Sequence, residues 1–579
     1  MQAKTIRKCA VLCVLMISSS ISMLSQELGS EMVEVVRQYT PSVNDAFKIR
    51  EIPSISDTIS QQKRPVQYSI FSVPVASTFT PAKGRAANLE RSRPMKIFDN
   101  YATLGVGNFT SVLAELSSNI EVSRTDNFGI FFTHNSSQGG IDDVLIEDKY
   151  YDTELNLNYT SRQRNMLWKT DVGIEHRLFN WYGLGLGLDT DNGMNPDFIA
   201  QQNYYSAYAG GEMIFNDAFF DNIEAKYRFF GDRYSSMEHH VEFSPSFELP
   251  LGEELFHTQV HFDYVTGSFE RGFLVDEPLD YSSMQVGLSS SLVVLRDDLT
   301  LNLGAAVYYH HDDANGNSGV YVYPKVSASY RMAGEYFIAY AAVEGDLKSN
   351  SYYQFTKENP FVSPTLLIQP TDQQYQAHVG AKGKLSSSIG YDVRARFSSE
   401  DNKALFRANS RLAPRNEEYQ HGNSFGVVYD QVNTFSGFGE INVDVNRDLT
   451  VRLNGEYFLY DTSDQDEAWN LPEFKASLFL DYQIGENWSL GANAFFVGER
   501  KDLLTTWSPI FVDPPQEVHT VASLDSYFDL NAKLAYRFND QLSAFVRGYN
   551  LLGDNYERWV DYPVLGLQVL AGITYKFDF

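Results

Sequence analysis

Cysteine is nearly absent from this 579-residue chain, which has only Cys9 and Cys13. Both lie in a segment that we expect to be removed, so the mature protein should contain no thiol. This excludes disulfides, thiol catalysis and cysteine-ligated metals. Long apolar runs are lacking as well. No stretch approaches the ~18 uninterrupted apolar residues of a spanning helix, so we predict no transmembrane helix.

Basic residues are also scarce relative to acidic ones. The chain has 46 Lys and Arg against 74 Asp and Glu, for a formal net charge of −28 at pH 7. An acidic chain repels nucleic acid and offers no basic patch for phosphate groups. We therefore expect no nucleic-acid partner.

The N-terminus has the features of a targeting segment. Three basic residues, the last of them Lys8, precede the nine apolar residues Cys9–Ile17, and serines follow. The apolar run is about half the ~20 residues of a membrane anchor, which predicts a secretory signal peptide over residues 1–25. A lipoprotein with Cys13 as its lipidated residue is the alternative, but the bulky Leu12 argues against it.

Aromatic residues and strict alternation are abundant. The chain has 40 Phe, 36 Tyr and 6 Trp, and in its closing stretch Gly566–Phe579 every odd position from Leu567 is apolar. Side chains on a strand point alternately to opposite faces, so this stretch predicts a strand with one apolar face. Strands of soluble domains usually have ~5–6 residues, whereas a strand that crosses a bilayer at a tilt needs ~9–11.

The same alternation recurs along the chain. It is clearest in Leu299–Tyr309, Phe435–Val445, Leu449–Leu459, Phe474–Tyr482 and Leu524–Phe538. Ten short turns are expected, near residues 125, 163, 217, 252, 297, 334, 387, 447, 486 and 540. Longer polar connections are expected at Trp181–Ala200, Asp312–Ser318, Asn350–Gln373, Glu400–Gly422, Lys501–Ser523 and Gly553–Val564. Ten short turns, with both chain ends at the same rim, give 22 strands.

The sequence thus predicts an all-β fold. Residues 96–579 should form a transmembrane antiparallel β-barrel of about 22 strands, with short periplasmic turns and long extracellular loops. Residues 26–95 differ, because they contain six prolines and little alternation. We interpret them as a Pro-rich N-terminal segment, periplasmic or lumenal.

The last three strands resemble the end of TonB-dependent outer-membrane receptors, in which the penultimate strand ends in an Asn-Leu-aliphatic-turn-Tyr pattern, here Asn550–Tyr556. The resemblance implies a 22-stranded barrel that binds or takes up a solute at the outer membrane of a Gram-negative bacterium, without enzymatic activity. It also implies that barrel-insertion machinery recognises the aromatic residues of the last strand, Tyr575, Phe577 and Phe579. Outer-membrane lipid would surround the barrel.

The resemblance is weaker at the N-terminus. Residues 26–95 have about half the length of a plug domain and lack its glycine- and arginine-rich motifs, although a lumen of this size is normally plugged. The segment itself, inward-folded loops or a partner protein are the candidates for closing it. Glu31–Val36 resembles the short box that pairs with TonB, with Val33, Val35 and Val36 as its apolar residues. An ordinary strand is the alternative.

A second function is consistent with these features. A barrel without a plug would suit a structural subunit of a larger outer-membrane assembly for protein insertion or export. Partners, whether TonB or another outer-membrane or periplasmic protein that closes the lumen, separate the two hypotheses.

Three motifs suggest chemistry, but each is explained more simply. Gly422–Gly426 matches the G-x-S-x-G nucleophile motif beside His421, but no helical pattern follows it. Asp189–Asp197 is acidic like a calcium loop, yet its glycine is misplaced and the bidentate Glu is missing. His239–His240 and His310–His311 are adjacent pairs, whose side chains point to opposite faces of a strand. We therefore expect no catalytic, cofactor or metal site.

Overall fold

A computed structural model describes residues 96–142, 144–184, 201–216, 219–251, 254–313, 316–411, 417–507 and 517–579. The expected signal peptide, the Pro-rich segment and the residues Val33, Val35 and Val36 lie outside the described residues. Among those described, no helix is long and apolar enough to cross a membrane.

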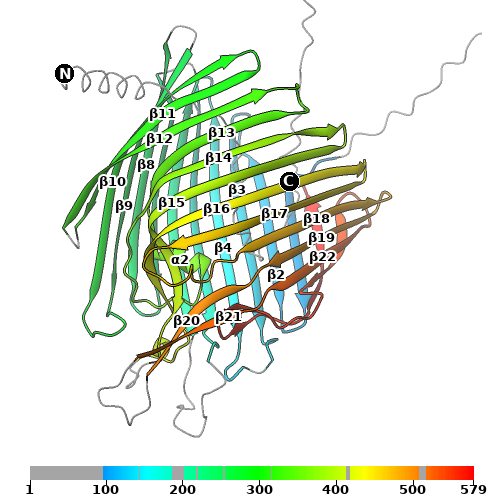
Figure 1. Ribbon diagram of the computed structural model, residues 1–579. Helices are drawn as coiled ribbons and strands as arrows, with labels where there is room; N and C mark the ends of the chain where they lie inside the picture. Colours follow the sequence, from blue (N-terminus) through cyan, green and yellow to red (C-terminus); the bar gives the residue numbers. More distant parts are fainter. Residues whose placement is uncertain are drawn as a thin grey trace, which may run out of the picture. The chain divides into compact units, whose positions relative to one another are not determined.

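The described residues form a closed antiparallel barrel of 22 strands, which confirms the predicted fold (Figure 1). The strands from the first to the eleventh are β1 (Asn100–Gly107), β2 (Val112–Glu121), β3 (Asp126–Gln138), β4 (Lys149–Arg162), β5 (Met166–Asn180), β6 (Gln201–Phe215), β7 (Phe220–Asp232), β8 (Met237–Leu251), β9 (Glu254–Phe269), β10 (Leu279–Arg296) and β11 (Leu299–Asp312). The others are β12 (Asn317–Arg331), β13 (Ile338–Lys348), β14 (Thr371–Ser386), β15 (Ile389–Ala408), β16 (Phe425–Asn446), β17 (Leu449–Thr462), β18 (Phe474–Ile484), β19 (Trp488–Val497), β22 (Tyr527–Arg537), β23 (Leu542–Tyr549) and β26 (Gln568–Phe577).

The barrel closes where its last strand pairs with its first. β26 runs antiparallel to β1, from Asn100 opposite Phe577 to Gly107 opposite Leu570. The Thr103 and Thr574 hydroxyls lie 2.9 Å apart across this seam. A closed sheet has no unpaired edge, as a β-structure in lipid requires.

The ten short turns lie where the sequence predicts them. β10 ends at Arg296 and β11 begins at Leu299, and the other nine turns likewise connect strands at the predicted positions. Three residues in these turns, Asp297, Gly334 and Gly485, have positive φ angles of 47°, 59° and 63°. The reversal needs this left-handed backbone, for which Asp and Gly are suited.

Several connections at the other rim contain more β-structure than expected. β11 and β12 are joined by a short connection, not the long loop expected at Asp312–Ser318. β15 extends to Ala408 and β16 begins at Phe425, and a separate hairpin of β20 (Arg500–Trp507) and β21 (Glu517–Leu524) occupies the expected loop Lys501–Ser523. Apolar and polar residues do not alternate regularly in these segments. A prediction based on alternation therefore assigns them to loops.

Apolar side chains cover the outside of the barrel and polar ones line the inside. In β5, Val172 and Ile174 are about half exposed, whereas Glu175 and Arg177 are buried on the opposite face. The last strand follows the same rule, with Val569, Ala571, Ile573 and Tyr575 of β26 exposed. An apolar exterior on a closed barrel matches lipid, so the strands span a membrane.

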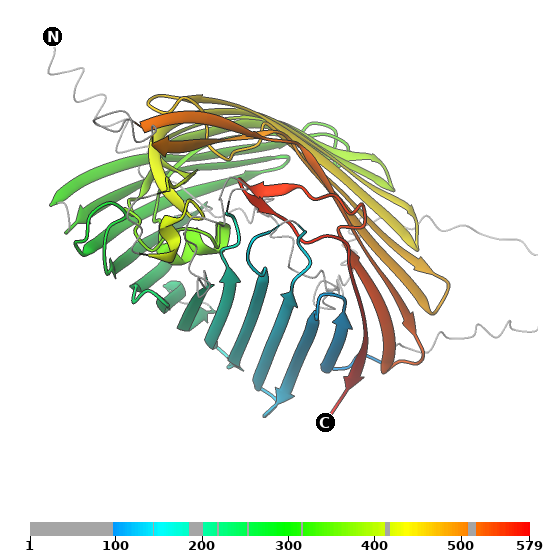
Figure 2. The ribbon, with the colours of Figure 1, turned by 90° about the horizontal axis from the view of Figure 1, so that it is seen from below.

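Two further elements lie in loops at the long-loop rim. The helix α2 (Tyr352–Glu358) is in the β13–β14 connection, and the small hairpin of β24 (Glu557–Trp559) and β25 (Tyr562–Pro563) is in the β23–β26 connection. A 3₁₀ turn, η3 (Glu418–Gln420), precedes β16. In Figure 2, α2 and the β24–β25 hairpin lie inside the ring of strands.

Candidate functional site

The helix α2 is the centre of the candidate site. The Ser351 side chain caps its N-terminus by accepting a hydrogen bond from the Gln354 backbone N–H at 3.1 Å. Pro360 follows the C-terminal Asn359 and cannot continue a helix. Only seven residues long, α2 depends on its surroundings for stability. Its residues Tyr352 and Phe355 are buried.

A carboxylate on the barrel wall holds the start of this helix. Glu238 of β8 accepts hydrogen bonds from the backbone N–H groups of Tyr352 (2.6 Å) and Tyr353 (3.1 Å), and from the Tyr281 hydroxyl (2.6 Å). The first N–H groups of a helix have no partner within it, and its N-terminus favours a negative charge. Glu238 thus joins α2 to the lumen wall.

A cation on the same side of the barrel, three strands away, holds the end of the helix. Arg177 of β5 donates to the Thr356 carbonyl oxygen at 2.9 Å and to its Oγ1 at 2.8 Å. Glu175 pairs with Arg177 at 3.1 Å and also with Lys357. A cation beside the last carbonyl groups suits the helix dipole. Both ends of α2 are therefore fixed to charged side chains of the barrel.

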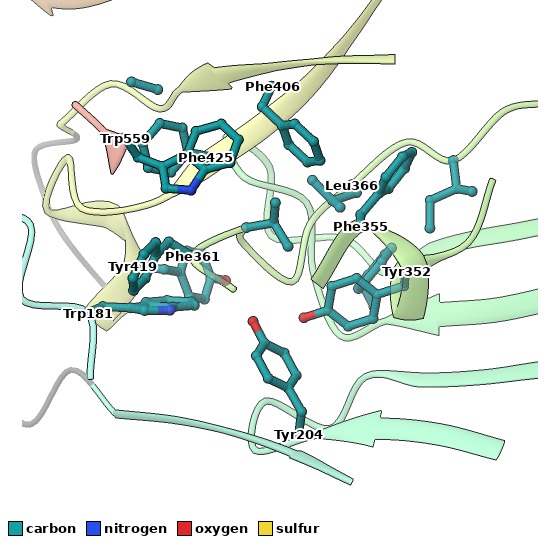
Figure 3. Close-up of a cluster of buried hydrophobic side chains, with 14 of the residues drawn as sticks. Trp181, Tyr204, Tyr352, Phe355, Phe361, Leu366, Phe406, Tyr419, Phe425 and Trp559 are labelled. Atoms are coloured by element: carbon teal, nitrogen blue, oxygen red, sulfur yellow. The ribbon is translucent and has the colours of Figure 1, made fainter. Parts of the chain in front are cut away.

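Aromatic residues from four connections pack around α2 into one hydrophobic cluster (Figure 3). We call residues 181–184, 349–370 and 417–424 together with the β24–β25 hairpin the loop cap. The Tyr562 ring stacks on the Phe361 ring with centroids 3.7 Å apart, and its hydroxyl donates to the Asn423 carbonyl at 2.6 Å. The Trp181 indole donates to the Pro360 carbonyl at 3.2 Å. The loop cap is thus a packed structure.

Burial keeps the phenols of the loop cap neutral. It raises the pKa of Tyr562 well above its usual value, and that of Tyr182 likewise. A neutral phenol can donate a hydrogen bond, as Tyr182 does to the Pro563 carbonyl at 2.8 Å. These contacts should therefore persist over the physiological pH range.

A cavity of about 430 Å³ lies between the barrel wall and the loop that carries α2. Its lining from the barrel is mostly titratable and includes His240, Glu242, His261, Asp263 and Asp346. Ser349, Asn350 and Gln354 line it from the loop. The cavity is therefore polar and rich in oxygen and nitrogen donors.

Two cavity residues are already in contact. The Nε2 atom of His240 lies 2.9 Å from Oδ2 of Asp263, and the Ser349 hydroxyl donates to Oδ1 of Asp263 at 2.7 Å. Glu242 lies directly opposite Asp263 in the β8–β9 register. The site joins two neighbouring strands and the α2 loop.

This arrangement was not predicted from the sequence, although the spacing of the residues indicates a shared face. Glu238, His240 and Glu242 occupy alternate positions of one strand, and His261 and Asp263 do so on the next. A period of two places each set on one face. His240 therefore shares its face with Glu238 and Glu242, and not with the adjacent His239.

The histidine pairs are separated as expected. His239 is exposed and lies 2.8 Å from the Tyr227 hydroxyl, while His240 is buried in the lumen wall. His310 is buried near Ser283, and His311 contacts Ser318 and Asp313. Neither pair can chelate one ion.

The serine of the G-x-S-x-G match is part of the loop cap. Ser424 donates to the Tyr419 carbonyl at 2.7 Å and accepts from the Asn409 side chain at 2.9 Å. The next residue begins β16, so a strand and not a helix follows it. The serine does not stand at a nucleophile elbow. The acidic stretch Asp189–Asp197 lies outside the described residues.

The aromatic residues of the last strand lie near the short-turn rim. Tyr575 is exposed on the outer face, its ring stacks against Phe577 at 6.0 Å, and Phe579 follows the strand at 89 % exposure. Outward rings near this rim can face lipid or be recognised during insertion. Their role in insertion stays a prediction.

No protein-family model matches the sequence, and no curated protein matches it. Solved structures do. The FrpB iron transporter of Neisseria meningitidis is 10 % identical with a TM-score of 0.63, covering 83 % of this chain and 82 % of its own. The ferric-catecholate import receptor Fiu of E. coli K12 is 12 % identical with a TM-score of 0.59 over 83 % and 82 %.

The copper transporter OprC is 12 % identical with a TM-score of 0.58 over 84 % of this chain and 82 % of its own. At these identities the likeness concerns the fold. Together with the apolar exterior, it places the chain in the outer membrane of a Gram-negative cell. The chain is a 22-stranded outer-membrane β-barrel with the fold of TonB-dependent siderophore and metal receptors.

Proposed function

We propose that the protein binds a solute at the cell surface and takes it up across the outer membrane in a TonB-dependent manner. The observation that carries this proposal is the loop cap, which is anchored in the barrel by Glu238 and Arg177 and has a polar cavity beneath it. A wide barrel with packed inward loops suits a binding receptor better than an open pore. No catalytic role is proposed.

The proteins with this fold named above transport or import iron compounds and copper. This favours uptake over the alternative of a structural subunit in protein insertion or export. The inward-folded loops are one of the three candidates for closing the lumen. Residues 26–95 and a partner protein remain the other two.

TonB engagement is proposed through Val33, Val35 and Val36. Pairing of this segment with a strand of TonB would use backbone N–H groups, which proline lacks. The test is the double variant Val33→Pro/Val35→Pro, with Val33→Ala/Val35→Ala as the matched control because alanine retains the N–H groups. Cellular contents of iron, copper, zinc and other metals are measured by mass spectrometry under metal limitation.

We expect the proline variant to match a deletion strain, and the alanine variant to retain most of the accumulation, with equal amounts of barrel in the membrane. Equal accumulation in the wild type and the deletion strain would contradict uptake of a metal-containing solute. If the wild type takes up metal and the proline variant does so equally well, the proposal that the segment with Val33, Val35 and Val36 engages TonB is wrong. Purification from native membranes tests the alternative, which requires stoichiometric partners other than the insertion machinery.

A further inference from the structure

Three side chains in the cavity converge as metal ligands do. One donor atom from each of His240, Glu242 and Asp263 lies within 4.8 Å of the other two. The donor atoms of a tetrahedral zinc site are ~3.4 Å apart, given metal–ligand distances of ~2.0–2.2 Å. Small side-chain rotations would therefore bring the three atoms onto one ion.

His240 pairs with only one of the two carboxylates of this group, Asp263. Asp263 is 3 % exposed and has His240 and Ser349 as partners. For Glu242, directly opposite, no hydrogen bond or ion pair is formed with any described residue. Two carboxylates this close repel each other, and a bound cation would remove the repulsion. If His240 and Asp263 formed only a structural ion pair, the presence of a second carboxylate, Glu242, beside them would have no explanation.

A buried amide beside Asp263 gives an independent indication of a ligand. Gln285 of β10 lies directly opposite Asp263 in the β9–β10 register and is 0 % exposed. Neither atom of its amide group has a hydrogen-bond partner in the described part of the chain. Buried polar groups are almost always paired, so an unpaired one indicates a missing water, ion or ligand.

These residues form a continuous row on the lumen wall. Glu242, Asp263, Gln285 and His310 lie opposite one another on the successive strands β8 to β11. Aligned carboxylate, amide and imidazole groups provide oxygen and nitrogen donors across four neighbouring strands of the lumen wall. Gln285 of β10 and His310 of β11 thus continue the row of polar side chains beyond the three-residue site.

The donor set selects the class of ion. One imidazole with two carboxylates is typical of divalent first-row metals such as Zn²⁺, whereas Ca²⁺ and Mg²⁺ prefer oxygen alone. We propose that His240, Glu242 and Asp263 bind a divalent first-row transition-metal ion on the lumen wall, beneath α2. The statement that this ion is the transported solute depends on the proposed function. The existence of the site does not.

A second group, on β7, β8 and β9, provides a matched control. Asp221, Glu248 and His257 also come within 4.8 Å of one another, near the opposite rim. All three are only half-buried, and the cavity under α2 does not include them. This group should bind a metal weakly or not at all.

The test measures Zn²⁺ binding to the purified, full-length, metal-free protein in detergent, by competition with a chromogenic chelator. We expect one tight site in the wild type. Glu242→Gln should weaken it at least tenfold without lowering the thermal unfolding temperature of the metal-free protein, because Glu242 forms no hydrogen bond with the described residues and the substitution removes its repulsion of Asp263. His240→Gln should weaken it similarly, whereas His257→Gln should stay within twofold of the wild type.

Co²⁺ in place of Zn²⁺ adds a spectroscopic readout. Its visible absorption should change on binding to the wild type and to His257→Gln, but not to Glu242→Gln. The proposal is overturned if the wild type binds Zn²⁺ no more tightly than Glu242→Gln, or if His257→Gln abolishes binding. If the purified protein binds Zn²⁺ tightly but the deletion strain accumulates as much metal as the wild type, the metal site is supported and the uptake function is contradicted. If the deletion strain accumulates less metal but the purified protein does not bind Zn²⁺, the uptake function is supported and the metal site is contradicted.

Discussion

Glu238 on the lumen wall binds the first turn of α2 through both carboxylate oxygens, with Oε2 accepting from the Tyr352 N–H and Oε1 from the Tyr353 N–H. Glu238 and Tyr352 are 114 positions apart in the sequence. The helix therefore depends on the barrel for its orientation. Any movement of α2 away from the wall must break both bonds.

Removing this carboxylate should release the loop. In Glu238→Ala, two helix N–H groups and the Tyr281 hydroxyl lose their acceptor, at a cost of ~1–3 kcal/mol for each group left buried and unpaired. We expect trypsin to cleave after Lys357 at least tenfold faster than in the wild type, with the barrel intact, as followed by mass spectrometry. Glu242→Gln on the same strand is the control and should be cleaved at the wild-type rate. Equal rates for Glu238→Ala would show that the aromatic cluster alone holds the loop.

Gly183 allows two connections to pack closely. A Cβ atom at this position would lie 2.2 Å from Cε2 of Tyr562, whose ring is buried against Phe361. Gly183→Ala should therefore displace the β24–β25 hairpin, and hydrogen exchange of residues 557–563 should be about tenfold faster. Gly437→Ala, where a Cβ meets no atom within 4 Å, serves as the control. Unchanged exchange in the first variant would contradict this packing.

The attachment of the β20–β21 hairpin should depend on pH. Asp502 is 0 % exposed, and burial raises its pKa to about 6, although Asn470 and the Ala408 N–H donate to it. A folded-state pKa above the unfolded value of about 3.8 means that the folded state binds the proton more tightly. The associated stability is present below about pH 4 and is lost as the pH rises through 6, by ~3 kcal/mol at most.

Hydrogen exchange of residues 500–505 at pH 4.5 and pH 7.5, corrected for intrinsic rates, measures this effect. We expect faster opening at the higher pH in the wild type. Asp502→Asn carries no titratable group, so the two pH values should then give the same opening free energy. A wild-type profile that slopes in the opposite direction would show that the hydrogen bonds outweigh burial.

The aromatic end of the last strand is expected to act in membrane insertion. Phe579→Ala and Phe577→Ala should lower the amount of barrel in the outer membrane several-fold, as measured by quantitative immunoblotting of membrane fractions. Phe538, which follows β22 at the same rim and is 58 % exposed, provides the control. If Phe538→Ala lowers the amount of barrel in the membrane equally, the aromatic rings act through contact with lipid, and the predicted recognition of the last strand by the insertion machinery is wrong.

The sequence predicted the barrel better than the site. Alternation and turns such as Asp297–Asp298 are local, so they specify strands and the strand number without knowledge of the neighbours. The loop cap depends on contacts between residues far apart, such as Arg177 with Thr356 and Tyr562 with Asn423. No local pattern encodes these contacts.

The metal-ligand candidates fall between these two cases. The spacing of Glu238, His240 and Glu242 indicated a shared face, but their approach to Asp263 depends on the register of β8 with β9. Register is set by the whole pair of strands, and a shift of one residue would move each side chain to the other face. The shared face of the β8 residues was therefore predictable from the sequence, whereas their contact with Asp263 of β9 was not.

The seam between β1 and β26 has a kinetic consequence. The Asp99 N–H bonds to the Asp578 carboxylate, 479 positions away, so the ring cannot be completed until synthesis has reached the final residues. Until then, the edges of the first and last strands are exposed in a chain with many apolar positions. Such edges promote aggregation, and long-range pairing is slow. The edges of β1 and β26 therefore have to be kept apart from other chains until the two strands pair with each other.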